Sequence, residues 1–237
     1  MAHVLAIVQA RSQSSRLPGK VLCEINGKPS IYWVMKRVER AKCLDKVVLA
    51  TSSKTADDTL SDVARFNGWS LSRGSEEDVM LRFYDVIERE SPEVIVRVCA
   101  DNFAICPSVI DQAVEKCAES GLDICNPFLN HSYPFGVGAE VATVDAFRRI
   151  FSATRDVAPR YREHIFSWAY EAPEAYKIET LEAPEPLSRP DVNVSVDTCP
   201  DLKRLSKIYD EYRSSELDFE VKEIIATWDR HSGQSDW

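Results

Sequence analysis

The stretch HVLAIVQARSQSSRLPGKVLCEI, residues 3–25, joins an apolar run to a polar loop. The apolar run, residues 3–8, predicts a buried strand. The loop that follows contains three cations, Arg11, Arg16 and Lys20, and residues 9–23 contain no acid. A loop at the carboxyl end of a strand exposes unpaired backbone N–H groups, and added cations favour phosphate there. The alternative is a solvated surface loop.

Composition excludes several classes of protein. With 237 residues, 44% of them hydrophobic, the chain can bury a substantial core, and we expect one domain over residues 1–237. A net charge of −9 opposes nonspecific contact with nucleic acid or an anionic membrane, so neither is an expected partner. Because no apolar run approaches the ~20 residues of a membrane span and no signal-peptide pattern is present, we expect a cytoplasmic protein. The seven scattered cysteines predict reduced packing residues.

Strand and helix signals alternate through the first half of the chain. Beyond residues 3–8, strands are predicted at 47–51, 69–72 and 94–99, and helices at 31–41, 57–66, 78–90 and 107–119. This alternation predicts an α/β fold, a doubly wound, mostly parallel, Rossmann-like sheet with helices on both faces. With strand order 3-2-1-4, the loop at 9–23 faces the loop at 100–107 across the crevice where such folds bind ligands.

The second half has a different pattern. Residues 122–170 mix short strand signals with Pro and Gly, and predict a small inserted lobe with a helix at 159–169. Beyond it we expect strands at 176–182 and 192–196 and closing helices at 200–212 and 219–228.

The cationic loop matches neither G-x-x-x-x-G-K-[ST] nor G-x-G-x-x-G. QARSQSSRLPGKVL, residues 9–22, instead resembles the signature loop of the acylneuraminate and spore-coat-polysaccharide-type cytidylyltransferases, the CMP-sugar synthetases. Further segments resemble this family in the family's order: VVLATSSKTADD (47–58), RGSEEDVMLRFYD (73–85), VRVCADNFAICPSVID (96–111), YPFGVGAEV (133–141), REH (162–164) and VSVDTCPDL (194–202).

The resemblance implies a fold and a reaction. The fold would be of the nucleotide-diphospho-sugar transferase type, with the lobe at about 122–170 serving acceptor binding and homodimerisation. The anomeric hydroxyl of an acidic sugar, a nonulosonic or 3-deoxy-2-ulosonic acid, would attack the α-phosphorus of CTP with Mg²⁺ as cofactor and release pyrophosphate. Such a step depends on charge neutralisation and in-line positioning.

The resemblance also implies residue roles. Lys20, Arg16 and Asp101 would be catalytic. The nucleotide would contact Gln9, Ala10, Arg11, Ser15, Arg16, Lys20, Thr51, Ser52, Arg73, Gly74 and Ser75. For Arg11 the alternative is a surface ion pair, and for Asp78 and Arg82 an i,i+4 ion pair is as plausible as a ligand role.

Two carboxylates are the expected metal ligands. Mg²⁺ prefers a few carboxylates together with phosphate oxygens. Asp101, directly after the fourth strand, and Asp197, after residues 192–196, fit that preference, although helix capping is the alternative for both. Asp201 is expected to supply charge to the first turn of a helix instead.

The acceptor side would contain Tyr133, Gly136, Glu140, Arg162 and His164. Arg162 is the expected cation for a sugar carboxylate. His164 could accept the anomeric proton, but packing or capping is the commoner role of a helical histidine.

The chain departs from the family at two positions beside Asp101. Phe103 stands where relatives usually have Pro, and Ala100 where they tend to have Gly. These changes bear on the acceptor, so other hypotheses stay open: a phosphonate, phosphorylated alcohol or sugar phosphate acceptor, or a non-catalytic nucleotide-binding protein.

Overall fold

A seven-stranded sheet forms the centre of the molecule. The computed structural model describes residues 2–14, 16–213 and 218–233. The strands lie in the order β5-β4-β1-β6-β8-β7-β9. Their bounds are β1 (Val4–Gln9), β4 (Lys46–Ser52), β5 (Ser70–Gly74), β6 (Val94–Cys99), β7 (Ile124–Asn126), β8 (Glu140–Thr143) and β9 (Ile178–Thr180).

The first four strands of this sheet are parallel and have the predicted 3-2-1-4 order. β8 runs antiparallel to β6 and β7, while β7 and β9 are parallel. The predicted α/β fold with a doubly wound, mostly parallel sheet is therefore confirmed. β1 lies inside the sheet, between β4 and β6, and its residues are buried on both faces: Leu5 and Ile7 join one hydrophobic cluster, and Ala6 and Val8 join the other.

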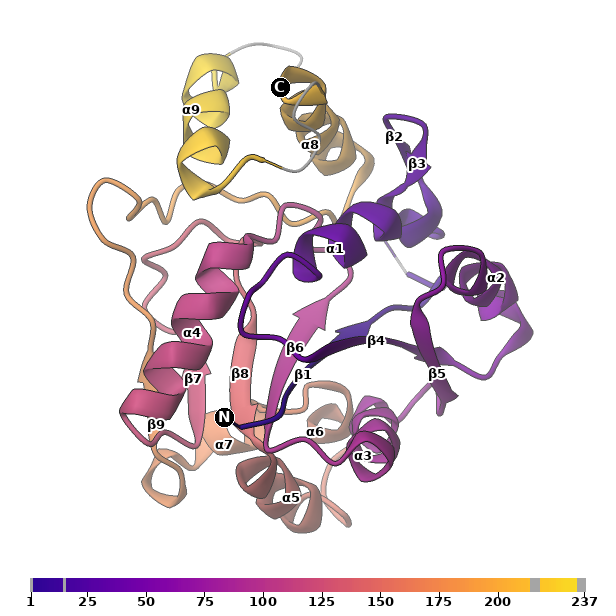
Figure 1. Cartoon of the computed structure of the whole chain (residues 1–237), viewed down its shortest axis with the longest axis vertical. Helices are drawn as coiled ribbons and strands as arrows, with labels where there is room; N and C mark the ends of the chain where they lie inside the picture. Colours follow the sequence, from indigo (N-terminus) through magenta and orange to yellow (C-terminus); the bar gives the residue numbers. More distant parts are fainter. Residues whose placement is uncertain (1, 15, 214–217, 234–237) are drawn as a thin grey trace.

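Helices cover both faces of the sheet (Figure 1). One cluster packs the sheet against α1 (Ser30–Val38), α2 (Asp58–Phe66), α4 (Pro107–Glu119), α8 (Cys199–Glu211) and α9 (Val221–His231). The other packs it against α3 (Val79–Glu90), α5 (Val144–Ala153) and α7 (Ser167–Glu171). In Figure 1, β6 points toward the end of the molecule where α8 and α9 lie. The hydroxyl of Tyr209 on α8 donates to the carbonyl of Phe103, just beyond β6, at 2.6 Å.

Several predicted elements differ from the structure. Residues 192–196 form no strand of the sheet, and an isolated bridge joins Asn193 to Phe135. The backbone groups of this segment bond to loops and not to a neighbouring strand. Val194 N donates to Phe135 O and Val196 N to Asp101 O. The predicted helix at 159–169 is two short helices, α6 (Arg160–Glu163) and α7, since His164 leaves the helical conformation.

Residues 122–170 contribute β7 and β8 to the sheet and α5, α6 and α7 to one face. The hairpin of β2 (Glu24–Ile25) and β3 (Lys28–Pro29) was not predicted, nor were the short helices η1 (Lys20–Leu22), η2 (Thr55–Asp57) and η3 (Pro173–Ala175). All seven cysteines are free thiols, and burial raises the pKa of Cys106 and Cys125 to about 12. Within the described residues, no helix is long and apolar enough to cross a membrane.

Candidate active site

Lys20 joins three separate parts of the chain. Its Nζ donates to Asp101 Oδ2 at 2.9 Å, to Asp197 Oδ1 at 3.0 Å and to the carbonyl of Val196 at 2.8 Å. Lys20 is 9% exposed, whereas the carboxylate side chains keep 33% and 27% of their surface. The predicted juxtaposition of the cationic loop with Asp101 is therefore present, and Asp197 joins it from the far end of the sequence.

The loop around Lys20 is held by its own backbone. Gly19 has φ +73°, a conformation that side chains disfavour, and its N–H donates to Ser12 O at 2.8 Å. Ser30 Oγ donates to Lys20 O at 2.6 Å from the start of α1. These bonds turn the chain back on itself and direct the Lys20 side chain toward Asp101.

The two arginines of the loop lie nearer the surface. Arg16 pairs with Asp197 Oδ1 at 2.9 Å while its side chain is 66% exposed. Arg11 pairs with Glu163 at 3.1 Å, and both side chains are about half exposed, so the surface ion pair considered for Arg11 is present. Ser15 lies outside the described residues. Arg16 is thus close to the Lys20 cluster, and Arg11 contacts α6.

Asp57 connects the loop to β4, a role that the motif comparison did not assign. Asp57 Oδ1 accepts from the backbone N–H of Ser12 at 2.6 Å. Its Oδ2 accepts from the N–H of Ser52 at 3.2 Å and from the Ser52 hydroxyl. Burial alone would raise the pKa of Asp57, but the hydrogen bonds from Ser52 and Ser12 lower it. The ionised Asp57 carboxylate therefore holds the cationic loop, through Ser12, against the end of β4, through Ser52.

Five of the residues predicted to contact the nucleotide lie around the ends of β4 and β5: Thr51, Ser52, Arg73, Gly74 and Ser75. Arg73 donates to Ser52 O at 2.9 Å and to Lys54 O at 2.8 Å. Gly74 O accepts from Ser53 N at 2.8 Å. Ser75 Oγ accepts from Asp78 N at 3.1 Å. Arg73 and Ser75 therefore shape these loops through the backbone.

Arg82 and Asp78 make no ion pair with each other. Arg82 donates to the carbonyls of Ser75 and Glu76 at 2.6 and 3.2 Å. Asp78 caps α3 by accepting from Leu81 N at 2.7 Å. A β-carbon on Gly74 would lie 3.0 Å from Cγ of Arg82, so glycine permits this close approach.

One buried nitrogen near these loops lacks a partner. Arg82 Nε is inaccessible and makes no hydrogen bond within the protein, whereas buried polar groups are nearly always paired. The buried hydroxyls of Ser12 and Thr51 act on Asp57, where they help to lower the pKa of the carboxylate. The unpaired nitrogen lies on α3, close to Ser75 and Glu76.

Gln9 and Ala10 make hydrogen bonds within the protein. Ala10 N donates to Ala50 O at 3.1 Å, and Gln9 O accepts from Ala100 N at 3.0 Å. The Gln9 side chain accepts from Arg97 Nε at 3.1 Å. The Gln9 amide thus faces β6 and the second half of the sheet.

Glu140 lies in a buried polar network. It forms an ion pair with Arg97 and accepts from the hydroxyl of Tyr170 at 2.5 Å and from the amide of Asn126 at 3.3 Å. Arg97, Tyr170 and Asn126 were not predicted as site residues, although an arginine inside the apolar run VIVRVC was a visible signal.

Tyr133 and Gly136 have structural surroundings. Tyr133 is 2% exposed and donates from its hydroxyl to Gln112 on α4 at 3.2 Å. Gly136 has φ +102°, and a β-carbon there would lie 2.7 Å from Ser195 N. Gly136 therefore allows the loop before β8 to approach the segment that ends at Asp197.

Arg162 is engaged inside the protein. Its Nε and Nη2 both donate to Asp78 Oδ2, at 3.0 and 2.8 Å, and its guanidinium lies 4.4 Å from the ring centroid of Phe151. A sugar carboxylate would compete with Asp78 for it. His164 is exposed and caps the end of α6, where its carbonyl accepts from Ser167.

The capping alternatives can be compared with the structure. α4 is capped by Cys106 rather than Asp101, and α8 by Thr198 in a capping box with Asp201. Capping thus explains neither Asp101 nor Asp197, and Asp201 lies in the first turn as predicted. No group of three or more His, Cys, Asp or Glu side chains in the described chain is arranged to hold a metal. Two carboxylates together still fit Mg²⁺ that takes its other ligands from phosphate and water.

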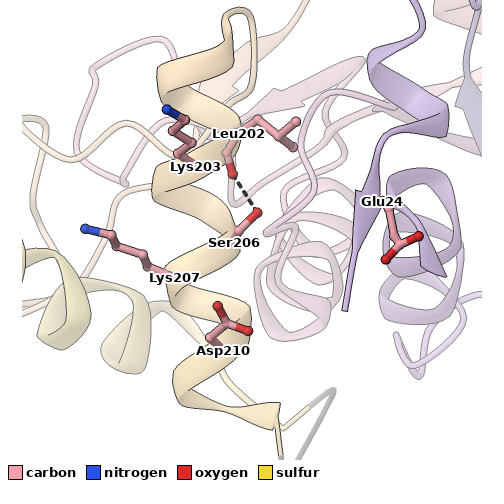
Figure 2. Close-up of a pocket in the computed structure, with 6 residues that line it drawn as sticks. All are labelled: Glu24, Leu202, Lys203, Ser206, Lys207 and Asp210. Carbon is pink, nitrogen blue, oxygen red and sulfur yellow. Dashed lines mark hydrogen bonds between the residues drawn. The ribbon is translucent and has the colours of Figure 1, made fainter. Parts of the chain in front are cut away.

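A hollow of about 510 Å³ lies between β2 and α8. Figure 2 shows Glu24 across from α8, with the hydroxyl of Ser206 bonded within the helix to the carbonyl of Leu202 at 2.8 Å. None of the predicted site residues lines it, and its charged groups have both signs. It offers no concentrated positive charge for a triphosphate.

Comparisons with known proteins agree with one another. A family model described as cytidylyltransferase matches residues 5–223. The spore coat polysaccharide biosynthesis protein SpsF of Bacillus subtilis (strain 168) is 32% identical over 235 residues, 98% of this chain and 96% of the relative.

Solved structures share the fold. A cytidylyltransferase from Leptospira borgpetersenii serovar Hardjo-bovis (strain JB197) has a TM-score of 0.90 at 24% identity and covers 98% of this chain and 96% of its own. A CMP:2-keto-3-deoxy-manno-octonic acid synthetase complexed with CTP has a TM-score of 0.67 at 16% identity and covers 89% of this chain and 99% of its own.

Proposed function

Because the chain belongs to the cytidylyltransferase family, we propose that it transfers CMP from CTP to an acidic sugar, a nonulosonic or 3-deoxy-2-ulosonic acid. The acceptor's anomeric oxygen bonds to the α-phosphorus of CTP, the bond from that phosphorus to the pyrophosphate oxygen breaks, and the hydroxyl proton is lost. The observation that carries the proposal is Lys20 held between Asp101 and Asp197 at the end of the cationic loop.

Lys20 and Arg16 neutralise the triphosphate in this proposal. The departing pyrophosphate gains charge, and preorganised cations stabilise such charge in the transition state. Arg16 is the more exposed of the two and offers a planar fork that suits phosphate oxygens. Both side chains contact the Asp197 carboxylate. When the triphosphate binds, Lys20 and Arg16 therefore exchange this carboxylate for phosphate oxygens.

The nucleobase lies beside β4 and β5 in this proposal. The buried Arg82 Nε, which makes no hydrogen bond within the protein, supports this placement. Cytosine has a small polar edge, and a pocket built for it rejects purines partly by size.

Mg²⁺ would be held by Asp101 and Asp197 together with phosphate oxygens. When bound, it would supply Lewis-acid charge to the phosphates. Asp101→Asn is expected to lose Mg²⁺-dependent turnover while CTP still raises the melting temperature. Unchanged turnover of Asp101→Asn across a Mg²⁺ titration would remove Asp101 from the metal site.

We also propose a homodimer formed through residues 122–170, as the resemblance implies. Phe135 and Leu129, in this segment, are 44% and 43% exposed, and the Phe135 ring contacts Phe128 with centroids 5.2 Å apart. Apolar side chains that lie together at the surface favour association, whereas a single exposed one does not.

The test is a CTP-dependent screen for pyrophosphate release. Purified protein, Mg²⁺ and CTP are incubated with a panel of nonulosonic and 3-deoxy-2-ulosonic acids, and in parallel with phosphonates, phosphorylated alcohols and sugar phosphates. Release with an acidic sugar supports the proposal. Release only with another class would change the acceptor, and no release from any of them, despite CTP binding, would favour a non-catalytic nucleotide-binding protein. Thermal shifts with CTP, UTP, ATP and GTP test the base preference.

A further inference from the structure

A row of polar side chains crosses one face of the sheet. Arg97 on β6 is in register with Glu140 on β8, and Asn126 extends the row on β7. Below them the same face is apolar, with Ile95, Ala142 and Ile124 in one hydrophobic cluster. Polar groups therefore replace the core where these strands approach the Lys20 cluster.

The polar row lies next to the Lys20 cluster along the chain. Arg97 is on β6, which ends at Cys99, two residues before Asp101. Its partner Gln9 is the last residue of β1, directly before the cationic loop. The ends of these two strands also supply Lys20 and Asp101, so the row adjoins the proposed reaction centre.

The Arg97 guanidinium is fixed on two sides only. Nε donates to Gln9 Oε1 at 3.1 Å, and Nη1 pairs with Glu140. Nη2 makes no hydrogen bond to any described residue, and, unlike Nε of Arg82, it is not among the buried unpaired atoms. The Nη2 amino group of Arg97 is therefore an unused hydrogen-bond donor, in a side chain that is 12% exposed.

The negative charge of Glu140 is shared between Arg97 and two other hydrogen-bond donors. Its carboxylate also accepts from Tyr170 at 2.5 Å and from Asn126 at 3.3 Å, so three donors share one negative charge. Burial and the adjacent Glu140 both raise the pKa of Tyr170 well above its usual value, which keeps its hydroxyl a donor. Arg97 can therefore pair with a second anion.

We propose that Arg97 is the residue that selects an acidic acceptor, with its free Nη2 edge binding the acceptor carboxylate while Gln9 and Glu140 hold the guanidinium in place. This rests on the proposed transfer of CMP. Arg162, the cation expected from the resemblance, has both of its fork nitrogens on Asp78. Arg97 thus replaces Arg162 as the carboxylate-binding cation.

The test compares an acid with its neutral analogue. Isothermal titration measures the binding of an eight-carbon 3-deoxy-2-ulosonic acid and of its C1 carboxamide to protein saturated with a non-hydrolysable CTP analogue. We expect wild type to prefer the acid. Arg97→Met/Glu140→Gln, which leaves no buried unpaired charge, should weaken acid binding about ten- to a hundredfold and leave carboxamide binding unchanged.

Controls separate selection from folding. The pair Arg148–Glu88, at 2.9 Å on the surface, provides Arg148→Met/Glu88→Gln, which should keep the wild-type preference. Equal losses for acid and carboxamide in the Arg97 variant, or a retained preference for the acid, would overturn the proposal. Wild type that binds the CTP analogue but binds acid and carboxamide equally would also overturn it. Failure of wild type to bind the CTP analogue would instead refute CMP transfer. Arg97→Lys gives a single-site check: its ammonium cannot reproduce the planar fork, so partial loss of the preference is expected.

Discussion

Lys20 is the residue on which the loop, Asp101 and Asp197 converge. A buried ammonium with two carboxylate partners is costly to remove, because the carboxylates then repel each other and any phosphate nearby.

Lys20→Met should therefore lower kcat/KM for CTP by about 10²- to 10³-fold, the usual loss when one preorganised donor is removed. The measurement is steady-state pyrophosphate release. Lys36→Met, which removes a lysine paired with Glu39 on α1, is the matched control and should leave kcat/KM near wild type. A Lys20→Met enzyme as active as the control would contradict the assigned role.

Asp57 gives a prediction about pH. Its pKa is lowered in the folded protein, so its stabilisation is fully present above the pKa of the unfolded chain, about 4, and is lost as pH falls toward the lower folded value. At pH 7, Asp57→Asn should lower the free energy of unfolding by about 1–3 kcal/mol, because Ser12 and Ser52 lose a charged acceptor.

The difference between wild type and Asp57→Asn should stay constant from pH 7 to about 4 and shrink as the pH falls further, which urea unfolding at each pH measures. Asp62→Asn, at an exposed pair with Arg65, should show little change at any pH. A difference that does not shrink below about pH 4 would show that these hydrogen bonds do not depend on the charge of Asp57.

The loop before β8 and the segment that ends at Asp197 form one unit at the scale of elements. Gly136 allows their contact, and Val194 N donates to Phe135 O at 2.8 Å. The position of Asp197 therefore depends on a glycine about sixty residues earlier in the sequence.

Gly136→Ala should cost about 1–3 kcal/mol of stability and also reduce turnover, because its β-carbon would displace Ser195 and so Asp197. Gly68→Ala is the matched control: Gly68 has φ +70° but nothing within 4 Å of an added β-carbon, so only backbone strain is added and turnover should persist. Urea unfolding and pyrophosphate release measure the two effects. Turnover that is equal in both variants would contradict the link between Gly136 and Asp197.

The sequence predicted the parallel strands, their helices and the closing helices α8 and α9 well, and it erred at residues 159–169 and 192–196. Segments 94–99 and 107–119 match β6 and α4 because buried strands and amphipathic helices have strong periodic signals. Residues 192–196 have the alternation of a strand, VNVSV, yet their backbone bonds to Phe135 and Asp101 instead of to the sheet. Alternation reports burial of every second side chain, and it does not identify the hydrogen-bond partner.

The candidate site was also predicted in part. Lys20 and Asp101 were predicted together because the topology brings the ends of β1 and β6 face to face. Arg162 was assigned from a motif alone, and the motif did not show that Asp78 would occupy it. Phe103, a departure from the family that was expected to bear on the acceptor, is fully buried in the core. The family resemblance is confirmed, and the acceptor residues stay predictions.

Association is the prediction that concerns the whole molecule. Sedimentation velocity should give the mass of a dimer for wild type and of a monomer for Phe135→Asp. Phe66→Asp is the control, since Phe66 is 90% exposed on α2, outside residues 122–170, and should leave the dimer intact. A monomeric wild type would contradict the dimer. Dissociation by Phe66→Asp but not by Phe135→Asp would place the interface outside residues 122–170.

The most direct test of cytidylyl transfer follows the phosphorus atoms of CTP by ³¹P NMR as protein, Mg²⁺ and an acidic sugar are mixed. Attack at the α-phosphorus predicts that the three CTP signals are replaced by pyrophosphate and one phosphodiester in equal amounts. Formation of CDP with inorganic phosphate, of free CMP without a phosphodiester, or an unchanged CTP spectrum with every acidic sugar would contradict it.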